Sequence, residues 1–350
     1  MSRKITPARM VRRSLEFSLC LLGTEWAKGM IRYISYLRDG YEKVKPWSTL
    51  SEEERSVTTN SGADLKDFHC PICVTPRDFV ESSDGVFGIG EHFIRKKLYS
   101  CSSCDFLFTN EDRGSRADYF SDTPYKDDKT GRRYQREVDL VDLGAKLCDL
   151  PADASVLVYA VGHCAAVQYL QANRRFNAWG ADVADDIEYG DRIINIASQP
   201  NYFREMNMKF DVIVAVEVWE HYDWRDVNKA FSWLLEHVAD DGVLLGTTSL
   251  WYPRPTDPYF KAKHEFGQEL LQWWHYPFFQ DHCSFYTEDN LRTLLGRHEF
   301  SPRFAYFESQ ECQRSDPGKR IVAVIHNKNK KATARFEFEF NRRFFPVFYS

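Results

Sequence analysis

The central part of the chain, between residues 136 and 327, alternates short apolar runs with segments of helical spacing. Four runs are almost continuously apolar, which is typical of strands buried on both faces, at 155–161, 177–183, 210–218 and 242–248. Around them, apolar residues recur every three or four positions, which predicts helices at 136–150, 165–173, 224–238 and 288–295. Two closing strands are expected at 304–307 and 320–327. This alternation predicts an α/β fold whose parallel sheet is covered by helices on both faces.

The N-terminal segment has a different pattern. Leucine and aromatic residues recur at helical spacing over residues 11–38, with arginines and a lysine between them, which predicts one long amphipathic helix. Two interpretations stay open: the helix packs on the body of the protein, or its basic face contacts an anionic membrane surface or a protein partner. The stretches 46–66 and 105–135 are polar, and we interpret both as linkers.

The C-terminal tail, residues 328–350, combines aromatic and basic side chains. From Phe336 to Phe340, phenylalanine alternates with glutamate, which is the period of two expected for a strand. One interpretation is an edge strand packed on the body, and the other is a tail that binds a partner. The sequence does not separate the two.

Composition narrows the class of protein. The chain has 350 residues, of which 43% are apolar and 28% charged, and this argues against overall disorder. The net charge of −5 is not that of a dedicated nucleic-acid binder, although residues 1–50 carry 10 Lys and Arg against 4 Asp and Glu. No apolar run approaches the ~20 residues that a spanning helix needs. The apolar stretch 14–23 contains Glu16, so we expect no secretion signal and a cytoplasmic protein.

Four of the nine cysteines form two CxxC pairs, Cys70 with Cys73 and Cys101 with Cys104. A CxxC turn places two thiolates close enough to share one ion, and a second pair completes a tetrahedral shell for Zn²⁺. A shell of four cysteines leaves no open position, so the predicted zinc is structural and substitutes for a core that a small module cannot bury. In a chain without a secretion signal, metal binding is favoured over disulfides.

A candidate ligand site follows the first apolar strand of the predicted sheet. Gly162 stands in the turn between that strand and the next helix, and Asp182 lies twenty residues later, at the tip of the second strand. Ligands of doubly wound sheets bind outside the carboxyl ends of the strands. We expect Gly162 at a turn that a ligand approaches closely, and the Asp182 carboxylate as an acceptor for the two hydroxyl groups of a ribose.

Three motifs resemble those of class I S-adenosylmethionine (SAM) methyltransferases. Residues 209–221, KFDVIVAVEVWEH, resemble the fourth-strand motif FDxIxxxEVxEH of that family. Residues 239–245, ADDGVLL, resemble the following turn and fifth strand, and HCSFYT at 282–287 resembles the late element HxSFYS. The resemblance covers about residues 135–327. It implies the seven-stranded Rossmann-like SAM-binding sheet, SAM as cofactor, and methyl transfer.

A cysteine-rich zinc module ahead of such a domain is similar to the layout of bacterial sugar C-methyltransferases, which act on nucleotide-linked deoxysugars. Their Tyr-His-Glu-His motif, implicated in acid–base chemistry, corresponds here to residues 279–282, FQDH. The resemblance implies His282 as the base, tuned by Asp281, while Phe279 replaces the tyrosine. His221, after the fourth strand, is the second candidate, because an unperturbed imidazole titrates near neutral pH.

The first SAM motif of the family, usually (D/E)xGxGxG, is degenerate in this chain. Val158 stands at the acidic position, and Ala160 and Cys164 replace two of the three glycines. Small side chains still leave room for the backbone to approach the cofactor. We therefore expect a cofactor site lined by Ala160, Gly162, Cys164, Asp182, Val183 and Glu217. Loss of the acid removes a partner for the SAM ammonium group. A second interpretation therefore stays open, in which the chain is a relative of the family that no longer binds SAM.

These patterns divide the chain into an N-terminal helix and linker (1–60), a zinc ribbon (61–115), a methyltransferase-like domain (116–327) and an aromatic, basic tail (328–350). We expect a SAM-dependent methyltransferase with a structural zinc module that acts on a small molecule, with a sugar or glycan precursor as a candidate. The alternative is an inactive methyltransferase-like scaffold that binds a partner. The sequence identifies neither the methylated atom nor the oligomeric state.

Overall fold

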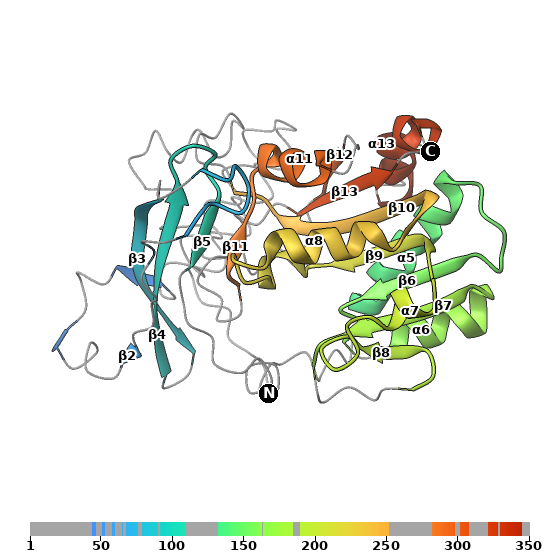
Figure 1. Cartoon of the computed structure of the whole chain (residues 1–350), viewed down its shortest axis with the longest axis horizontal. Helices are drawn as coiled ribbons and strands as arrows, with labels where there is room; N and C mark the ends of the chain where they lie inside the picture. Colours follow the sequence, from blue (N-terminus) through green and yellow to red (C-terminus); the bar gives the residue numbers. More distant parts are fainter. Residues whose placement is uncertain are drawn as a thin grey trace, which may run out of the picture.

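A computed structural model describes residues 44–46, 51–52, 58–59, 65, 68–75, 79–89, 92–109, 132–162, 164–184, 190–251, 282–297, 302–307, 321–327 and 330–344. These residues form two β-sheets that lie side by side, with helices around the larger one (Figure 1). The amphipathic helix expected at 11–38 lies outside the described residues, as do Asp281 and Phe279. None of the helices in the described ranges is long and apolar enough to span a membrane.

The larger sheet has seven strands in the order β12-β13-β10-β9-β6-β7-β8. Their bounds are Ser155–Tyr159 (β6), Asn177–Asp182 (β7), Ile193–Asn195 (β8), Phe210–Val216 (β9), Val238–Ser249 (β10), Arg303–Phe307 (β12) and Ile321–Asn327 (β13). The five neighbours from β10 to β8 run parallel, whereas β13 is antiparallel to β10 and β12 is antiparallel to β13. The predicted α/β fold with a parallel sheet is confirmed.

Helices cover both faces of this sheet. On one face lie α5, α6, the π-helical η3 and α13, with the bounds Arg132–Leu147, Ala165–Tyr169, Leu170–Arg174 and Lys330–Phe344. On the other face lie α8 (Val227–Glu236) and α11 (Glu288–Gly296). Alternate residues of each strand enter opposite cores: Val156 and Val158 pack against α5 and α6, and Leu157 points to the other face. Burial on both faces explains why the strands read as continuous apolar runs.

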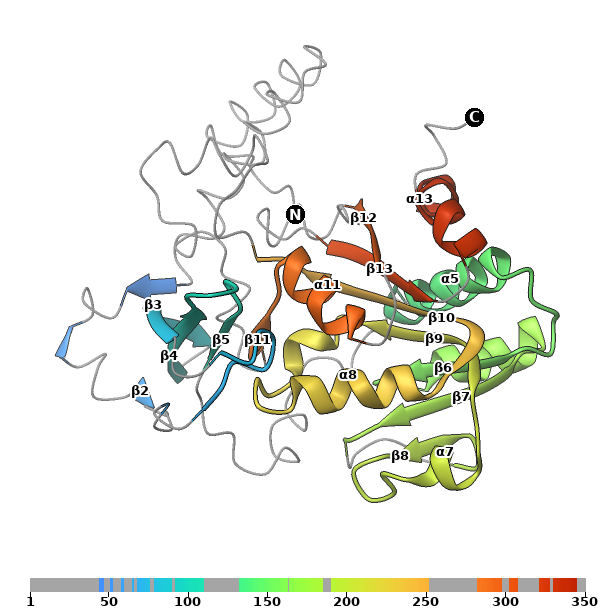
Figure 2. The same cartoon turned by 45° about the horizontal axis from the view of Figure 1, so that its top comes forward.

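The smaller sheet contains the CxxC pairs and takes one strand from the distant half of the sequence. Its main path is β1-β3-β4-β5-β11, and β2 pairs with β4. The bounds are Val44–Pro46 (β1), Thr58–Thr59 (β2), Phe79–Ile89 (β3), His92–Cys101 (β4), Leu107–Thr109 (β5) and Ser284–Phe285 (β11). β11 runs antiparallel to β5 and, in both views, lies on the side of the smaller sheet that is turned toward the larger one (Figures 1 and 2). The cysteine-rich part is therefore joined to the methyltransferase-like part by strand pairing.

Two sequence expectations differ from the structure. The stretch 105–135 is not wholly a linker, because Leu107 and Phe108 form a fully buried strand and α5 begins at Arg132. The tail is helical and not an edge strand, since α13 runs from Lys330 to Phe344. Phe336 and Phe340 are four residues apart, so both point to the same side of the helix and are fully buried. Glu339, one of the two glutamates between them, pairs with Lys146 of α5.

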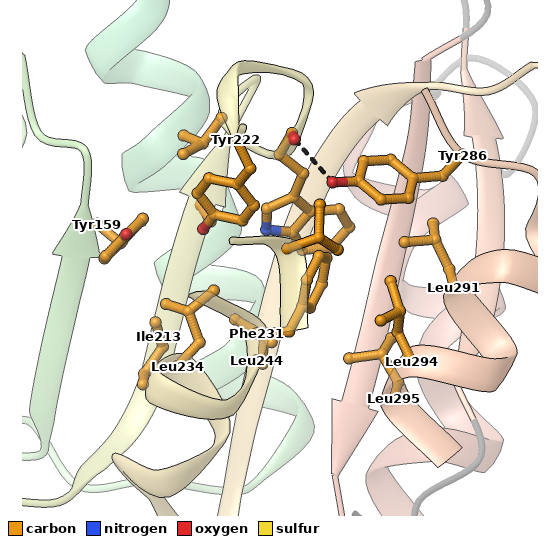
Figure 3. Packing of buried hydrophobic residues seen from close by; sticks show 14 of the residues in the cluster. Tyr159, Ile213, Tyr222, Phe231, Leu234, Leu244, Tyr286, Leu291, Leu294 and Leu295 are labelled. Atoms are coloured by element: carbon orange, nitrogen blue, oxygen red, sulfur yellow. Dashed lines mark hydrogen bonds between the residues drawn. The ribbon is translucent and has the colours of Figure 1, made fainter. Parts of the chain in front are cut away.

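The core below α8 and α11 is continuous with that of the smaller sheet, because one cluster of buried residues includes Cys70 and Phe108 together with Trp219 and Leu294. Figure 3 shows part of this cluster, where the Tyr286 hydroxyl donates to the Trp219 carbonyl at 2.9 Å. A side chain on Gly246 of β10 would overlap the Trp219 indole, so the glycine leaves room for it. Trp219 begins the 3-10 helix η4 (Trp219–His221), and its packing fixes that helix on the sheet.

Candidate active site and cysteine cluster

The loop after β6 adopts an unusual backbone conformation at the positions where the methyltransferase family has glycine. Ala160, Gly162 and Cys164 have φ values of 55°, 58° and 59°, in the left-handed region. This conformation costs a residue with a side chain roughly 1–2 kcal/mol, and such strain gathers at functional sites. A Cβ on Gly162 would meet no atom of the described residues within 4 Å, so this part of the structure leaves its backbone open to a ligand. At all three motif positions the loop thus has a backbone conformation that glycine adopts without strain, although only one of the three residues is glycine.

We expect Ala160→Gly to raise the free energy of unfolding by about 0.5–1 kcal/mol, because relief of the left-handed strain exceeds the added entropy of glycine in the unfolded chain. Urea unfolding followed by tryptophan fluorescence measures the change. The matched control is Ala165→Gly at the first residue of α6. Glycine there costs about 0.5–1 kcal/mol. Equal losses in the two variants would contradict strain at Ala160.

Asp182 is the last residue of β7, and its side chain is hydrogen-bonded to this loop. Its Oδ2 accepts from the Gly162 amide at 2.9 Å, and its Oδ1 accepts from the amides of Val183 and Ala184 at 2.7 and 3.0 Å. A carboxylate accepts about four hydrogen bonds. The side chain therefore fixes the tips of β6 and β7 relative to each other and retains capacity for about one more donor. Asp182 is 8% exposed, so it is largely buried between these amides.

Glu217 directly follows β9, which is the neighbour of β6 on the side away from β7. It also has a left-handed backbone, with φ of 51°. Its amide donates to the Thr247 carbonyl at 3.0 Å, and its buried carboxylate lies 4.0 Å from the Arg136 guanidinium of α5. The left-handed residues at the tips of β6 and β9 therefore share the carboxyl edge of the sheet, where ligands of doubly wound folds bind.

The two predicted histidines meet at the same edge. His221 is the last residue of η4, and His282 lies two positions before the first residue of β11. Their ring centroids are 4.8 Å apart, and the rings are nearly perpendicular at 88°. Glu220 joins them: one ligand atom from each of Glu220, His221 and His282 lies within 4.8 Å of the others. The two candidates for the base are thus parts of one cluster.

Glu220 was not among the predicted site residues, although it lies in the quoted fourth-strand motif beside His221. Its side chain is fully buried and accepts a hydrogen bond of 3.0 Å from the Thr248 hydroxyl of β10. An acidic residue inside an otherwise apolar stretch is the signal that could have identified it, since buried carboxylates need partners.

Hydrogen bonds hold the two segments of the cluster together. The Cys283 amide donates to the Glu220 carbonyl at 2.6 Å, and the Ser284 hydroxyl donates to the Tyr222 carbonyl at 2.7 Å. On the other side, the buried Lys96 ammonium of β4 donates to the His282 carbonyl at 2.9 Å. Burial raises the pKa of Tyr286, so its hydroxyl stays protonated as the donor to Trp219. These contacts fix His282 opposite η4.

The four predicted zinc ligands come together. The sulfurs of Cys70 and Cys104 are 3.6 Å apart, those of Cys73 and Cys101 are 3.5 Å apart, and all four lie within 4.8 Å of one another. Burial raises the pKa of the Cys101 thiol to about 12. The soft sulfur donor set and its closed arrangement fit a tetrahedral Zn²⁺.

The two CxxC turns have the same backbone pattern. The Cys70 carbonyl accepts from the amide of Val74, and the Cys101 carbonyl accepts from the amide of Asp105, in both cases four residues on. Val74 and Asp105 both have left-handed φ values, of 62° and 58°. Each first cysteine also donates its amide to the carbonyl of the residue five positions on. Repetition of one turn geometry indicates two equivalent knuckles built around a common centre.

Side chains of the methyltransferase-like part hold both knuckles. Asn228 of α8 donates to the Pro71 carbonyl at 2.6 Å, and Arg297 donates to the same carbonyl at 3.1 Å. Asn290 of α11 donates to the Cys104 carbonyl at 2.7 Å. The two turns of the cysteine-rich segment are therefore seated on α8 and α11.

Residues 132–303 match the family model described as "Methyltransferase domain". No curated protein sequence matches the chain. Among solved structures, the chain is similar to magnesium protoporphyrin IX methyltransferase from Synechocystis PCC 6803 with bound SAH (15% identity, TM-score 0.35, 57% of this chain and 84% of that one). It is also similar to a SAM-dependent methyltransferase from Clostridium acetobutylicum (12%, 0.34, 61% and 95%) and to the cyclopropane synthase MmaA2 from Mycobacterium tuberculosis (13%, 0.34, 54% and 84%).

The family match begins at the first residue of α5 and ends at the first residue of β12. It includes the left-handed loop after β6, the tip of β9 and the histidine pair. Over residues 132–303, the chain is similar to the methyltransferase domain that this family model describes.

Proposed function

We propose that the chain transfers a methyl group from SAM to a small polar molecule at the carboxyl edge of the larger sheet. The observation that carries the proposal is the family match together with the shape of the loop after β6, whose three left-handed positions coincide with the family's glycines. The fit is to the backbone: the open face of Gly162 admits the cofactor, and Asp182 retains capacity for one ribose hydroxyl.

SAM, when bound, would supply a methyl group carried on a sulfonium. An electron pair of the acceptor would form the new bond to the methyl carbon, and the pair of the broken carbon–sulfur bond would stay on sulfur. The protein orients the two reactants and removes the acceptor's proton. We place proton removal at the histidine pair, with His282 first and His221 second. His221 follows β9, which pairs with β6, the strand before the cofactor loop, and the His282 ring contacts His221. Asp281, the expected tuning group, lies outside the described residues, and Glu220 is the carboxylate that accompanies the pair.

We further propose a sugar or glycan precursor as the acceptor and Zn²⁺ as the structural ion of Cys70, Cys73, Cys101 and Cys104. The acceptor class rests on the similarity of layout to sugar C-methyltransferases. The ion is supported by the equivalent knuckles and by the distances between the four sulfurs. A closed shell gives this ion no position for substrate.

The test of the proposed function is SAM binding, followed by thermal unfolding. SAM at a hundredfold excess over its dissociation constant should stabilise the fold by about 2.7 kcal/mol, and the demethylated product SAH should also stabilise it. Asp182→Ala should lower SAM affinity by about tenfold to a hundredfold, as expected for loss of a charge-assisted hydrogen bond of about 1.5–3 kcal/mol.

Asp182→Ala also leaves three backbone amides without their acceptor, so the variant should lose stability of its own. Asp182→Asn keeps an acceptor oxygen and therefore separates the loss of stability from the loss of SAM affinity. It should recover part of the stability that Asp182→Ala loses, and a smaller part of the SAM affinity. The matched control is Asp191→Ala, an exposed position after β7. No stabilisation of the unmodified chain by SAM or SAH would contradict the proposal and favour the inactive scaffold.

A further inference from the structure

The cluster of Glu220, His221 and His282 has a composition that proton removal alone does not require. It contains two imidazoles and one carboxylate from two segments of the chain, with one ligand atom from each within 4.8 Å of the others. A single base needs one imidazole and a partner that orients it. Two imidazoles and a carboxylate that converge on one point are a donor set for a first-row divalent cation.

We propose that Glu220, His221 and His282 bind a divalent transition-metal cation, at a site distinct from the four cysteines. Nitrogen and oxygen donors suit Mn²⁺, Fe²⁺ or Zn²⁺, whereas thiolates select Zn²⁺. Three protein ligands leave positions for water or for an acceptor, in contrast to the closed cysteine shell.

The ligands are held before any ion binds. His221 ends η4, whose Trp219 is packed on Gly246, and His282 is fixed between the carbonyl contact to Lys96 and the bond from Cys283 to Glu220. The Thr248 hydroxyl orients the Glu220 carboxylate at 3.0 Å. Metal sites are built with outer partners of this kind, which fix the direction of the ligand.

Burial of Glu220 adds an electrostatic reason. Its carboxylate is fully buried, and a buried negative charge needs a compensating positive charge. Among the described residues, Lys96 is a fully buried cationic side chain that contacts this cluster, since its ammonium donates to the His282 carbonyl. Compensation by the lysine is therefore the competing explanation, and it differs from the proposal in requiring no metal.

The use of the cation rests on the proposed function. A cation at this cluster, beside the cofactor loop, lowers the pKa of a hydroxyl that coordinates it, so the acceptor loses its proton to solvent near neutral pH. When the cation is bound, His282 promotes proton loss as one of its ligands; in the protein without the cation, His282 is the base proposed above. Cation binding itself is a property of the free protein and is measured without SAM or acceptor.

The experiment titrates the full chain with Mn²⁺ after mild EDTA treatment that leaves zinc in the closed cysteine site, with zinc content checked by elemental analysis. Binding removes the sharp electron paramagnetic resonance signal of free Mn²⁺. We expect one Mn²⁺ per chain. Glu220→Gln, which preserves side-chain shape, and His282→Ala should each abolish this binding and leave the zinc content unchanged.

Two further variants set the scale. Thr248→Val removes the hydroxyl that orients Glu220 and should weaken Mn²⁺ binding by about 10–100-fold. His237→Gln is the matched control, because His237 is also buried but bonds to the Trp233 carbonyl at the end of α8. Its Mn²⁺ affinity should equal that of the unmodified chain.

Absence of Mn²⁺ binding to the folded chain, or unchanged binding in Glu220→Gln, would overturn the proposal and leave Lys96 as the compensating charge. SAM binding is measured separately on the same samples. Mn²⁺ binding without SAM binding would refute the methyl-transfer function alone, and SAM binding without Mn²⁺ binding would refute the cation site alone.

Discussion

His282→Asn is expected to lower the rate of methyl transfer by ~10²–10⁴-fold, the usual contribution of a positioned proton-transfer group. The ring lies against His221 and is fixed by contacts from Lys96 and Cys283 to the backbone around it, so asparagine cannot reproduce its position or basicity. SAM affinity should hardly change, since the loop that presents Gly162 is on a different strand. Release of SAH in the presence of nucleotide-linked sugars and other polar acceptors measures the rate, and calorimetry measures SAM affinity.

His237→Gln serves as the control here as well, and its rate should match that of the unmodified chain. His221→Asn tests the second candidate. Full activity of His282→Asn together with an inactive His221→Asn would transfer the role to His221. An unaltered rate in both variants would remove the histidine pair from the reaction.

Cys101→Ser is expected to abolish stoichiometric zinc and to destabilise the smaller sheet by several kcal/mol. Zinc binding in small four-ligand sites amounts to about 10–16 kcal/mol, and most of this depends on a complete shell. Cys101 is fully buried at the end of β4, so the loss should reach the part of this core that lies on β5 and α11, which includes Phe108 and Leu294. Elemental analysis measures the zinc, and hydrogen exchange locates the loss of protection.

We expect faster exchange in β5, β11 and α11 of this variant, while β6 to β8 keep their protection. Cys148→Ser is the matched control, because Cys148 is partly buried in the other core, beside α5. It should retain one zinc per chain. Absence of stoichiometric zinc in the unmodified protein, purified without chelator, would contradict the structural ion.

The strands of the larger sheet could be predicted because burial on both faces leaves a direct trace in the sequence, as in 210–218. The cysteine cluster could be predicted for a similar reason, since its chemistry fixes the spacing. α13 could not, because Phe336 and Phe340 fit a period of two and a period of four equally well. Contact with α5 decides between them, and this is tertiary information.

The sequence predicted several residues of the site, but not the contacts that bring them together. Both histidines were recognised from separate motifs, but their contact depends on the pairing of β11 with β5, which no local pattern indicates. Asp182 was recognised from its position after a strand, but not its three bonds to backbone amides. Glycine is the usual sequence signal of a left-handed position, but Val74 and Asp105 occupy these positions in the two knuckles. The shared turn geometry of the knuckles could therefore not be predicted from the sequence.

The placement of β11 in the smaller sheet has a consequence for the order of folding. Lys96 and His282, whose contact seats the histidine pair, are 186 residues apart in the chain. Contacts this distant form late, because the entropy of closing the intervening loop opposes them until both ends are structured. During synthesis, the residues around the cysteines emerge first and wait for β11 until most of the methyltransferase domain has left the ribosome. The histidine pair is therefore among the last parts of the molecule to assemble.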